Sequence, residues 1–508
     1  MRTFLTMPIL KSGLKAAILT DGAGDPEIAG TAADQWRQVL SGMLCMAALL
    51  FSGCGKVEFS HREEFFKLEP YAQDYVSTVL HEYYGTPTEM VVWDRLPLKK
   101  HLSTGTVIRA SENEVALELA GPHQEITPGT ELLWDSGPLK GKPSGWIRAW
   151  DEKTQTATLE GKLAELPEEG AKVIVGPGQV LARGRHLYAV HCQHCHGVSG
   201  DGNGPTAEYL NPLPRDYRKG IFKFTLTQAQ ERASRKDLAR TIEDGIPGTY
   251  MPSFKLLTPD ESESIIEYVL WLAMRGETEY QLVRYLSDDY SKDAVTEMVK
   301  SGLEKKKAGE EDYDTYASIR EDFTASINDP EDMAAELEGM IELITSRWAS
   351  AQESEAVLAP QENRVAYDAR SIAHGRELYL SKDLNCVACH GDAGYGDGPQ
   401  TYSITKDLET GEENQLPGLY DAWGHPIQPR NLHTGIYRGG RRPIDLYARV
   451  HAGIKGTPMP AFGAKLKDQD IWDLVNFIYS VPFETEQAGA GMQKAEDPAA
   501  VEKEVAVN

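Results

Sequence analysis

Two short stretches of the chain repeat the pattern C-x-x-C-H: HCQHCHG at residues 191–197 and NCVACHG at residues 385–391. The residues of these motifs are Cys192, Cys195 and His196 in the first copy and Cys386, Cys389 and His390 in the second. The chain has six cysteines, and the remaining two are Cys45, inside an apolar run, and Cys54, at the end of that run. No cysteine is left over for an ordinary disulfide framework, so the motif cysteines need a chemical explanation.

Three kinds of site could explain the pattern. A redox dithiol needs only the two cysteines and does not require a histidine beside the second one. A zinc site takes four ligands, and nothing in the local sequence requires the two distant pairs to meet. Covalent haem attachment uses all three residues, because the thiols add to the haem vinyl groups and the adjacent histidine becomes the proximal iron ligand. Two matches, each followed by glycine, favour a covalently bound haem c at each motif.

Methionines are the candidates for the sixth iron ligand. In the first copy, Met251 lies in the Gly/Pro-rich stretch GIPGTYMPSF, whereas Met274 lies late in an apolar helix, where a core role fits better. In the second copy, the matching stretch GIKGTPMPAF holds Met459, and His451 is a rival ligand. Such loops bury little, so a methionine in the same loop twice is better explained as a ligand. His/Met coordination fills both axial positions and raises the reduction potential of the haem.

The two copies match well beyond the motifs. GRHLY at residues 184–188 matches GRELY at 375–379, just before each C-x-x-C-H. DLARTIEDGIPGTYMP at 237–252 matches DLYARVHAGIKGTPMP at 445–460 without a gap. An internal repeat of this length predicts two copies of one domain.

These residues resemble class I c-type cytochromes, in particular the dihaem type found in the third subunit of cbb-type haem-copper oxidases. The resemblance rests on C-x-x-C-H, the Gly-rich turn after it and the M-P loop. It implies two tandem domains, mainly α-helical, in which an N-terminal helix ending at Cys192 crosses a C-terminal helix over residues 265–272. The predicted haem residues are Cys192, Cys195, Cys386 and Cys389 for attachment, and His196 with Met251 and His390 with Met459 for the two irons.

Further residues are expected to support each haem. TPDE at residues 258–261 predicts the start of the closing helix, with a capping threonine and a glutamate three positions on. The proximal histidines need a hydrogen-bond acceptor to fix the tautomer, and the loops at 211–214 and 427–429 are placed to offer a carbonyl. Arg215 and Arg430 either contact the haem propionates or form surface salt bridges, and the sequence leaves both interpretations open.

The N-terminal apolar run, residues 39–53, is too short to span a bilayer comfortably and fits the core of a signal peptide. The ending FSGC resembles a lipobox, in which Cys54 becomes the lipidated first residue of the mature chain. An ordinary cleaved signal or a short membrane anchor are the alternatives. We expect a protein on the periplasmic side of a bacterial membrane, because the family attaches its haem outside the cytoplasm.

Between the leader and the first motif, residues 62–84 show a helical pattern, and six β-like runs follow. The runs are GTVIRA, EVALELA, ELLWDS, GWIRAWD, TATLEG and AKVIVG. We therefore expect, in chain order, a leader (1–54), a helical segment (55–100), a small β module of barrel or sandwich type (101–178), a first cytochrome domain (179–277), a solvated charged helical linker (278–362), a second cytochrome domain (363–485) and a disordered tail (486–508).

Fifty-two basic and 77 acidic residues give a formal net charge of −25, which argues against a nucleic-acid partner. The function predicted is electron transfer between redox proteins, to or within a terminal oxidase complex, by a membrane-anchored dihaem cytochrome that is not itself an enzyme. A dihaem peroxidase and the cytochrome subunit of a membrane dehydrogenase are the alternatives. A peroxidase needs an iron position that is open or can open, and two M-P loops argue against it.

Overall fold

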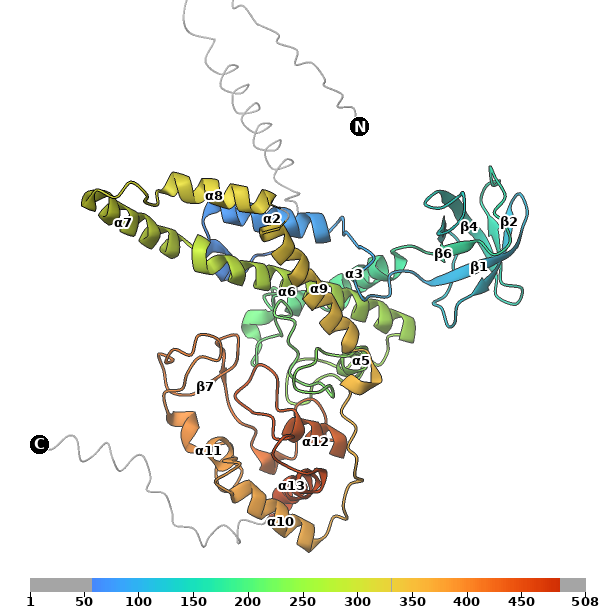
Figure 1. The fold of residues 1–508 in the computed structure, drawn as a ribbon. Helices are drawn as coiled ribbons and strands as arrows, with labels where there is room; N and C mark the ends of the chain where they lie inside the picture. The colour runs from blue at the N-terminus through green and yellow to red at the C-terminus, as the bar shows by residue number, and fades with distance from the viewer. Residues whose placement is uncertain (1–56, 330, 485–508) are drawn as a thin grey trace, which may run out of the picture. The chain divides into compact units, whose positions relative to one another are not determined.

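The computed structural model describes residues 57–329 and 331–484 (Figure 1). The expected leader, 1–54, with its lipidation candidate Cys54, and the expected tail, 486–508, lie outside the described residues. None of the described helices is both long and apolar enough to cross a bilayer.

Six short strands form a closed antiparallel barrel ahead of the first motif (Figure 1). They are β1 (Ser103–Ala110), β2 (Glu114–Leu119), β3 (Glu131–Trp134), β4 (Pro143–Asp151), β5 (Thr156–Leu159) and β6 (Lys172–Val175), in the order β1-β2-β5-β4-β3-β6 around the barrel. Alternate side chains turn inward, such as Ala157 and Leu159 on β5 and Val173 and Val175 on β6. Every β-like run of the sequence forms one strand, and the predicted β module is confirmed.

Each repeat is built on two crossing helices. The pairs are α3 (Gln179–His191) with the first half of α6 (Pro259–Tyr290), and α10 (Ala369–Leu380) with α13 (Asp468–Ser480). The helices approach closely because a glycine lies at each crossing. A Cβ on Gly184 would overlap the carbonyl oxygen of Ser264, and a Cβ on Gly375 would overlap that of Asp473.

Short elements complete the two repeats and the approach to them. They are the 3₁₀ helices η1 (Glu63–Lys67), η2 (Ala207–Tyr209), η3 (Ser354–Ala356), η4 (Pro399–Tyr402), η5 (Leu432–Thr434) and η6 (Val481–Phe483), the helices α2 (Pro70–Tyr84), α4 (Gln193–His196), α5 (Arg235–Asp244), α11 (Val387–His390) and α12 (Pro443–His451), and the two-stranded sheet of β7 (Leu419–Tyr420) and β8 (Pro426–Ile427).

The prediction of one helix over 62–84 is wrong at Leu68 and Glu69, which are extended between η1 and α2. Pro70 disfavours helical backbone in the residue before it and is accommodated at the first turn of α2 instead.

Helix α6 begins as the sequence predicts but ends later. The Thr258 side chain accepts from the backbone N–H of Glu261, whose carboxylate bonds back to Thr258. The helix then runs 32 residues, through the start of the predicted linker. The rest of that linker forms α7 (Lys292–Ala308), α8 (Tyr316–Asn328) and α9 (Met333–Ser350).

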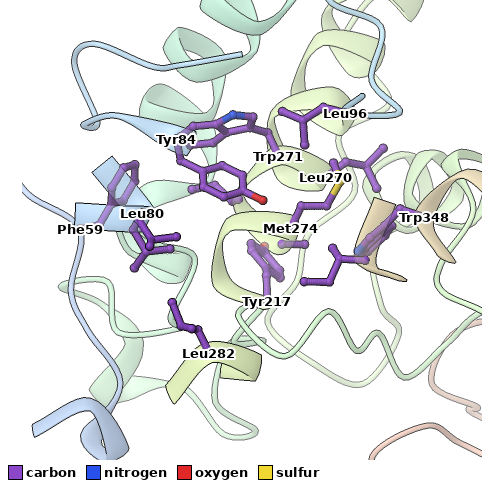
Figure 2. Close-up of a cluster of buried hydrophobic side chains, with 14 of the residues drawn as sticks. Phe59, Leu80, Tyr84, Leu96, Tyr217, Leu270, Trp271, Met274, Leu282 and Trp348 are labelled. Atoms are coloured by element: carbon purple, nitrogen blue, oxygen red, sulfur yellow. The ribbon is translucent and has the colours of Figure 1, made fainter. Parts of the chain in front are cut away.

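The expectation of a solvated linker is wrong for α9, which lies against α6. Ile341, Ile344 and Trp348 on one face of α9 are almost fully buried. Figure 2 shows Trp348 in the same apolar cluster as Trp271 and Met274 of α6. Met274 is fully buried there, which supports its core role.

Three carboxylates buried on α6 attach other segments to it. The hydrogen bonds run to Glu267 from the backbone N–H of Lys99 (2.8 Å), to Glu277 from the indole of Trp348 (2.8 Å) and to Glu279 from the backbone N–H of Arg62 (3.0 Å). Burial alone would raise the pKa of Glu279, but His61 and Arg275 outweigh it and bring the pKa to about 2. Glu279 is therefore a carboxylate at neutral pH and holds the segment before η1 in place.

Candidate functional site

The first motif opens into a cavity of about 360 Å³. The motif begins where α3 ends, at Cys192, and continues through α4. Cys192, Cys195, His196 and Met251 all line this one cavity, although Met251 comes from a loop far along the chain. Apolar side chains from α5, α6 and the residue after η2 surround them: Leu210, Leu238, Ile242, Ile265 and Val269. The structure thus brings together the thiols, the imidazole and the thioether that a covalently attached haem would use.

Both proximal histidine candidates are held by a backbone carbonyl. His196 Nδ1 lies 3.1 Å from the carbonyl oxygen of Arg215, and His390 Nδ1 lies 3.4 Å from that of Arg430. The predicted loops, 211–214 and 427–429, each end one residue short of the true acceptor. With Nδ1 donating, Nε2 keeps the lone pair that binds a metal. Burial lowers the pKa of both imidazoles, that of His196 to about 4, so the neutral ligand form is present at pH 7.

The pKa values and the positions of the cysteines argue against a redox dithiol and against a zinc site. Burial raises the pKa of the Cys192 thiol to about 12 and that of Cys386 to about 11. A redox dithiol needs the opposite shift, because the thiolate is its reactive form. Within the described residues, no three His, Cys, Asp or Glu side chains group around a common metal position, which disfavours a zinc site made of the two C-x-x-C pairs.

A tyrosine that sequence reasoning passed over supports each motif. Tyr188 donates to the carbonyl of Gly197, the residue after the first motif, at 2.9 Å. Tyr379 donates to the carbonyl of Gly391, after the second motif, at 2.6 Å. Both tyrosines are buried. The matching stretches GRHLY and GRELY carried this signal, since each ends on the tyrosine concerned.

The two methionine loops are fixed by the same contacts. The backbone N–H of Met251 donates to Thr249 Oγ1 at 3.1 Å, and its carbonyl accepts from Ile246 N at 3.1 Å. The same bonds in the second loop join Met459 to Thr457 Oγ1 and Ile454 N, at 3.2 Å each. These two hydrogen bonds fix the backbone of each loop and thereby set the direction of its methionine side chain.

The start of the second motif and Met459 pack against the same core cluster. Cys386 and Met459 both contact the apolar core of the second repeat. The rival ligand His451 stacks on the ring of Tyr447 at the end of α12. It lines a different cavity, which holds no residue of the motif. The structure therefore favours Met459 over His451.

Comparison with known protein families matches the cytochrome c family twice, over residues 181–273 and 372–482. The chain carries two tandem cytochrome c domains. We call them domain 1 and domain 2. Such domains transfer electrons through a covalently bound haem c.

No curated protein matches the chain. Among solved structures, a chain of the reducing HAO-like protein complex of Kuenenia stuttgartiensis is similar, with a TM-score of 0.38 and 23% identity. The match covers 59% of this chain and 95% of that one.

The two arginines predicted near the propionates differ in their surroundings. The guanidinium of Arg215 lies 3.9 Å from the centre of the Trp423 ring, and Arg215 lines the cavity of domain 1. Arg430 donates from Nε to the carbonyl of Ile436 at 2.6 Å and does not line that cavity. Neither arginine forms an ion pair within the described part of the chain, which disfavours the salt-bridge interpretation.

Domains 1 and 2 contact each other through matching positions of the repeat. Gly248 of the first methionine loop lies against Ile436 of domain 2, and Gly456 of the second loop lies against Ile221 of domain 1. Gly248 corresponds to Gly456 in the repeat, and Ile221 corresponds to Ile436. The interface is therefore close to two-fold symmetric. In each domain, the segment that follows the carbonyl bonded to the histidine faces the methionine loop of the other domain.

Proposed function

We propose that the protein is an exported dihaem c-type cytochrome that passes electrons between redox proteins of a respiratory chain, to or within a terminal oxidase complex. The observation that carries the proposal is the shared cavity of Cys192, Cys195, His196 and Met251, with the same loop contacts around Met459. His196 and Met251 line the same cavity and would both be available to hold the iron of a haem bound there, an arrangement that suits a carrier.

Different residues of the chain would have different roles in such a carrier. A bound haem supplies the one-electron chemistry of its iron. The thiols of each motif would hold the haem, and the carbonyls of Arg215 and Arg430 orient the imidazoles. The apolar part of the cavity wall would keep water from a haem bound there, so its surroundings would need little rearrangement when its charge changes by one. A net charge of −25 suits a partner with a basic docking face.

A dihaem peroxidase is the second candidate. The two methionine loops have the same hydrogen bonds, and this similarity argues against a peroxidase. Peroxidase chemistry needs one iron with an open or displaceable ligand, whereas both loops here are closed by the same two hydrogen bonds. A cytochrome subunit of a membrane dehydrogenase complex fits the same geometry and differs only in its partner.

Haem content tests the proposal directly. Matured by a c-type haem attachment system, the protein is expected to keep two haems per chain through boiling in denaturant, because thioether bonds survive it. The double change of Cys192 and Cys195 to serine should leave one haem, and so should the double change of Cys386 and Cys389. Haem staining of denaturing gels and intact mass measure the number. A wild-type chain that loses its haem on denaturation would contradict covalent attachment.

We also propose that Cys54 carries a lipid anchor on the periplasmic side of the membrane. The support is the lipobox-like sequence FSGC at residues 51–54. Cys54→Ser is expected to move the protein from the membrane to the soluble fraction, measured by fractionation at high salt. Cys45→Ser is the matched control, since it keeps the lipobox and should leave the protein in the membrane fraction. A Cys54→Ser protein that stays in the membrane points to the leader as the anchor.

A further inference from the structure

Domain 2 contains a long segment that domain 1 lacks. The stretch from Pro399 to Pro429 is much longer than the matching stretch from Pro205 to Pro214. We call residues 403–428 the insertion. It carries β7 and β8 and lies partly against domain 1. Asp421, His425, Pro426 and Ile427 of the insertion line the same cavity as the first C-x-x-C-H motif.

One tryptophan of the insertion is surrounded by cations of domain 1. Besides Arg215 at 3.9 Å, the Nζ atoms of Lys223 and Lys219 lie 5.8 Å and 5.9 Å from the centre of the Trp423 ring. Lys223 also bonds to Asp421 Oδ2 at 2.7 Å, and Lys219 bonds to Glu409 Oε2 at 2.6 Å. The insertion thus holds three cations of the other domain, and among the described residues Arg215 has only the ring face as its partner.

A further cation enters the cavity from domain 2 itself. Arg438 lines the cavity, and its Nε is buried without a hydrogen-bond partner among the described residues. Arg438 is the counterpart of Lys223 in the repeat, so the two matching cations meet at one cavity. Burial lowers the pKa of Lys223 to about 8 and also lowers that of Arg438.

These charges are not balanced by the carboxylates of the cavity. Asp421 bonds to Lys223, and burial alone would raise its pKa, but Lys223 brings the pKa below its usual value. Asp237, the other carboxylate there, accepts from the backbone N–H groups of Leu226 and Ser234. Arg215, Lys223 and Arg438 are half-buried, and such cations in excess are costly unless a ligand brings negative charge. A haem brings two propionate carboxylates.

We propose that the first haem site is built by both domains: Arg215, Lys223 and Arg438 bind the haem propionates, and Trp423 and Asp421 of the insertion position Arg215 and Lys223. This inference rests on the proposed haem at Cys192 and Cys195. It predicts that domain 2 sets the reduction potential of the haem in domain 1. Positive charge beside a haem favours the ferrous state, which carries one positive charge fewer, so loss of a held cation lowers the potential.

The test is a redox titration of the holoprotein, followed by visible absorption. Trp423→Ala is expected to shift the reduction equilibrium of one haem about tenfold toward the ferric form, a fall of about 59 mV for one electron. Trp423→Phe keeps a ring under Arg215 and should restore most of the potential. Trp146→Ala, at an exposed tryptophan of the barrel, is the matched control and should leave both potentials unchanged. Repeating the titration in a Met459→Ala background, where the second haem is displaced in potential, identifies the haem that moves.

Arg438→Gln provides a second route that leaves Trp423 in place, should the alanine variant mature poorly. It is expected to lower the same potential, whereas Arg441→Gln, at an exposed arginine outside the cavity, should not. If both potentials stay unchanged in Arg438→Gln while two haems remain bound, the composite site is overturned and the carrier function stands. If the first motif binds no haem at all, the function proposal fails instead.

Discussion

Met251→Ala and Met459→Ala are each expected to free the sixth position of one iron. Each change should lower the reduction potential of that haem by on the order of 0.2 V, within the roughly 0.8 V range that axial ligands command. The ferrous haem concerned should then bind carbon monoxide, and the ferric protein should lose its share of the weak red absorption band of thioether ligation. The cause is the same in both domains, because the same hydrogen bonds fix both methionine loops.

Met274→Leu is the matched control for these changes. Met274 is fully buried in the core of α6 and is no ligand in this assignment, so the spectrum should not change. Stability should fall by less than about 1.5 kcal/mol, since the two side chains have similar volume. Two results would contradict the ligand assignment. If Met459→Ala leaves the spectrum intact while His451→Ala alters it, domain 2 uses the histidine. If the native ferrous protein already binds carbon monoxide at one haem, that iron is open and the peroxidase alternative gains support.

Local sequence signals predict the parts of the haem sites that lie close together in the chain. C-x-x-C-H, the M-P loop and the capping threonine at 258 are short patterns whose geometry depends on a few neighbouring residues. The repeat adds a second observation of each pattern, and the repeated Tyr188 and Tyr379 could have been found in the same way. The six strands also follow from local alternation and turn residues.

Contacts between distant segments could not be predicted in this way. No periodicity places Trp423 over Arg215, because the contact depends on how two domains meet. The burial of α9 had a visible sign, since Ile341, Ile344 and Trp348 follow helical spacing, but the surrounding charged residues suggested a solvated helix. The proline at position 70 also indicated that the helix predicted over 62–84 would be interrupted. The apolar pattern continues on both sides of Pro70, and it favoured a single helix.

The helix crossings give the second large expected effect, and it concerns assembly rather than chemistry. Gly184→Ala should separate α3 from α6, because the added methyl would overlap the carbonyl oxygen of Ser264. Gly375→Ala should do the same to α10 and α13 at Asp473. A backbone carbonyl in a helix cannot rotate away, so each change is expected to cost about 3 kcal/mol or more. The loss should fall on the domain that carries the change, since each crossing belongs to one repeat.

Gly339→Ala is the matched control, at an exposed glycine of α9 with open space where the methyl would lie. It should stabilise the protein by about 0.5–1 kcal/mol, because alanine loses less backbone freedom than glycine in a helix. Urea unfolding of the holoproteins, followed by haem absorption and by far-ultraviolet circular dichroism, separates the cases. Each crossing lies within one domain, so the midpoint of one haem transition should fall more in Gly184→Ala and that of the other should fall more in Gly375→Ala. If all three variants unfold alike, the glycines are not needed at the crossings, and the close approach of the helices does not determine how each cytochrome c domain closes around its haem.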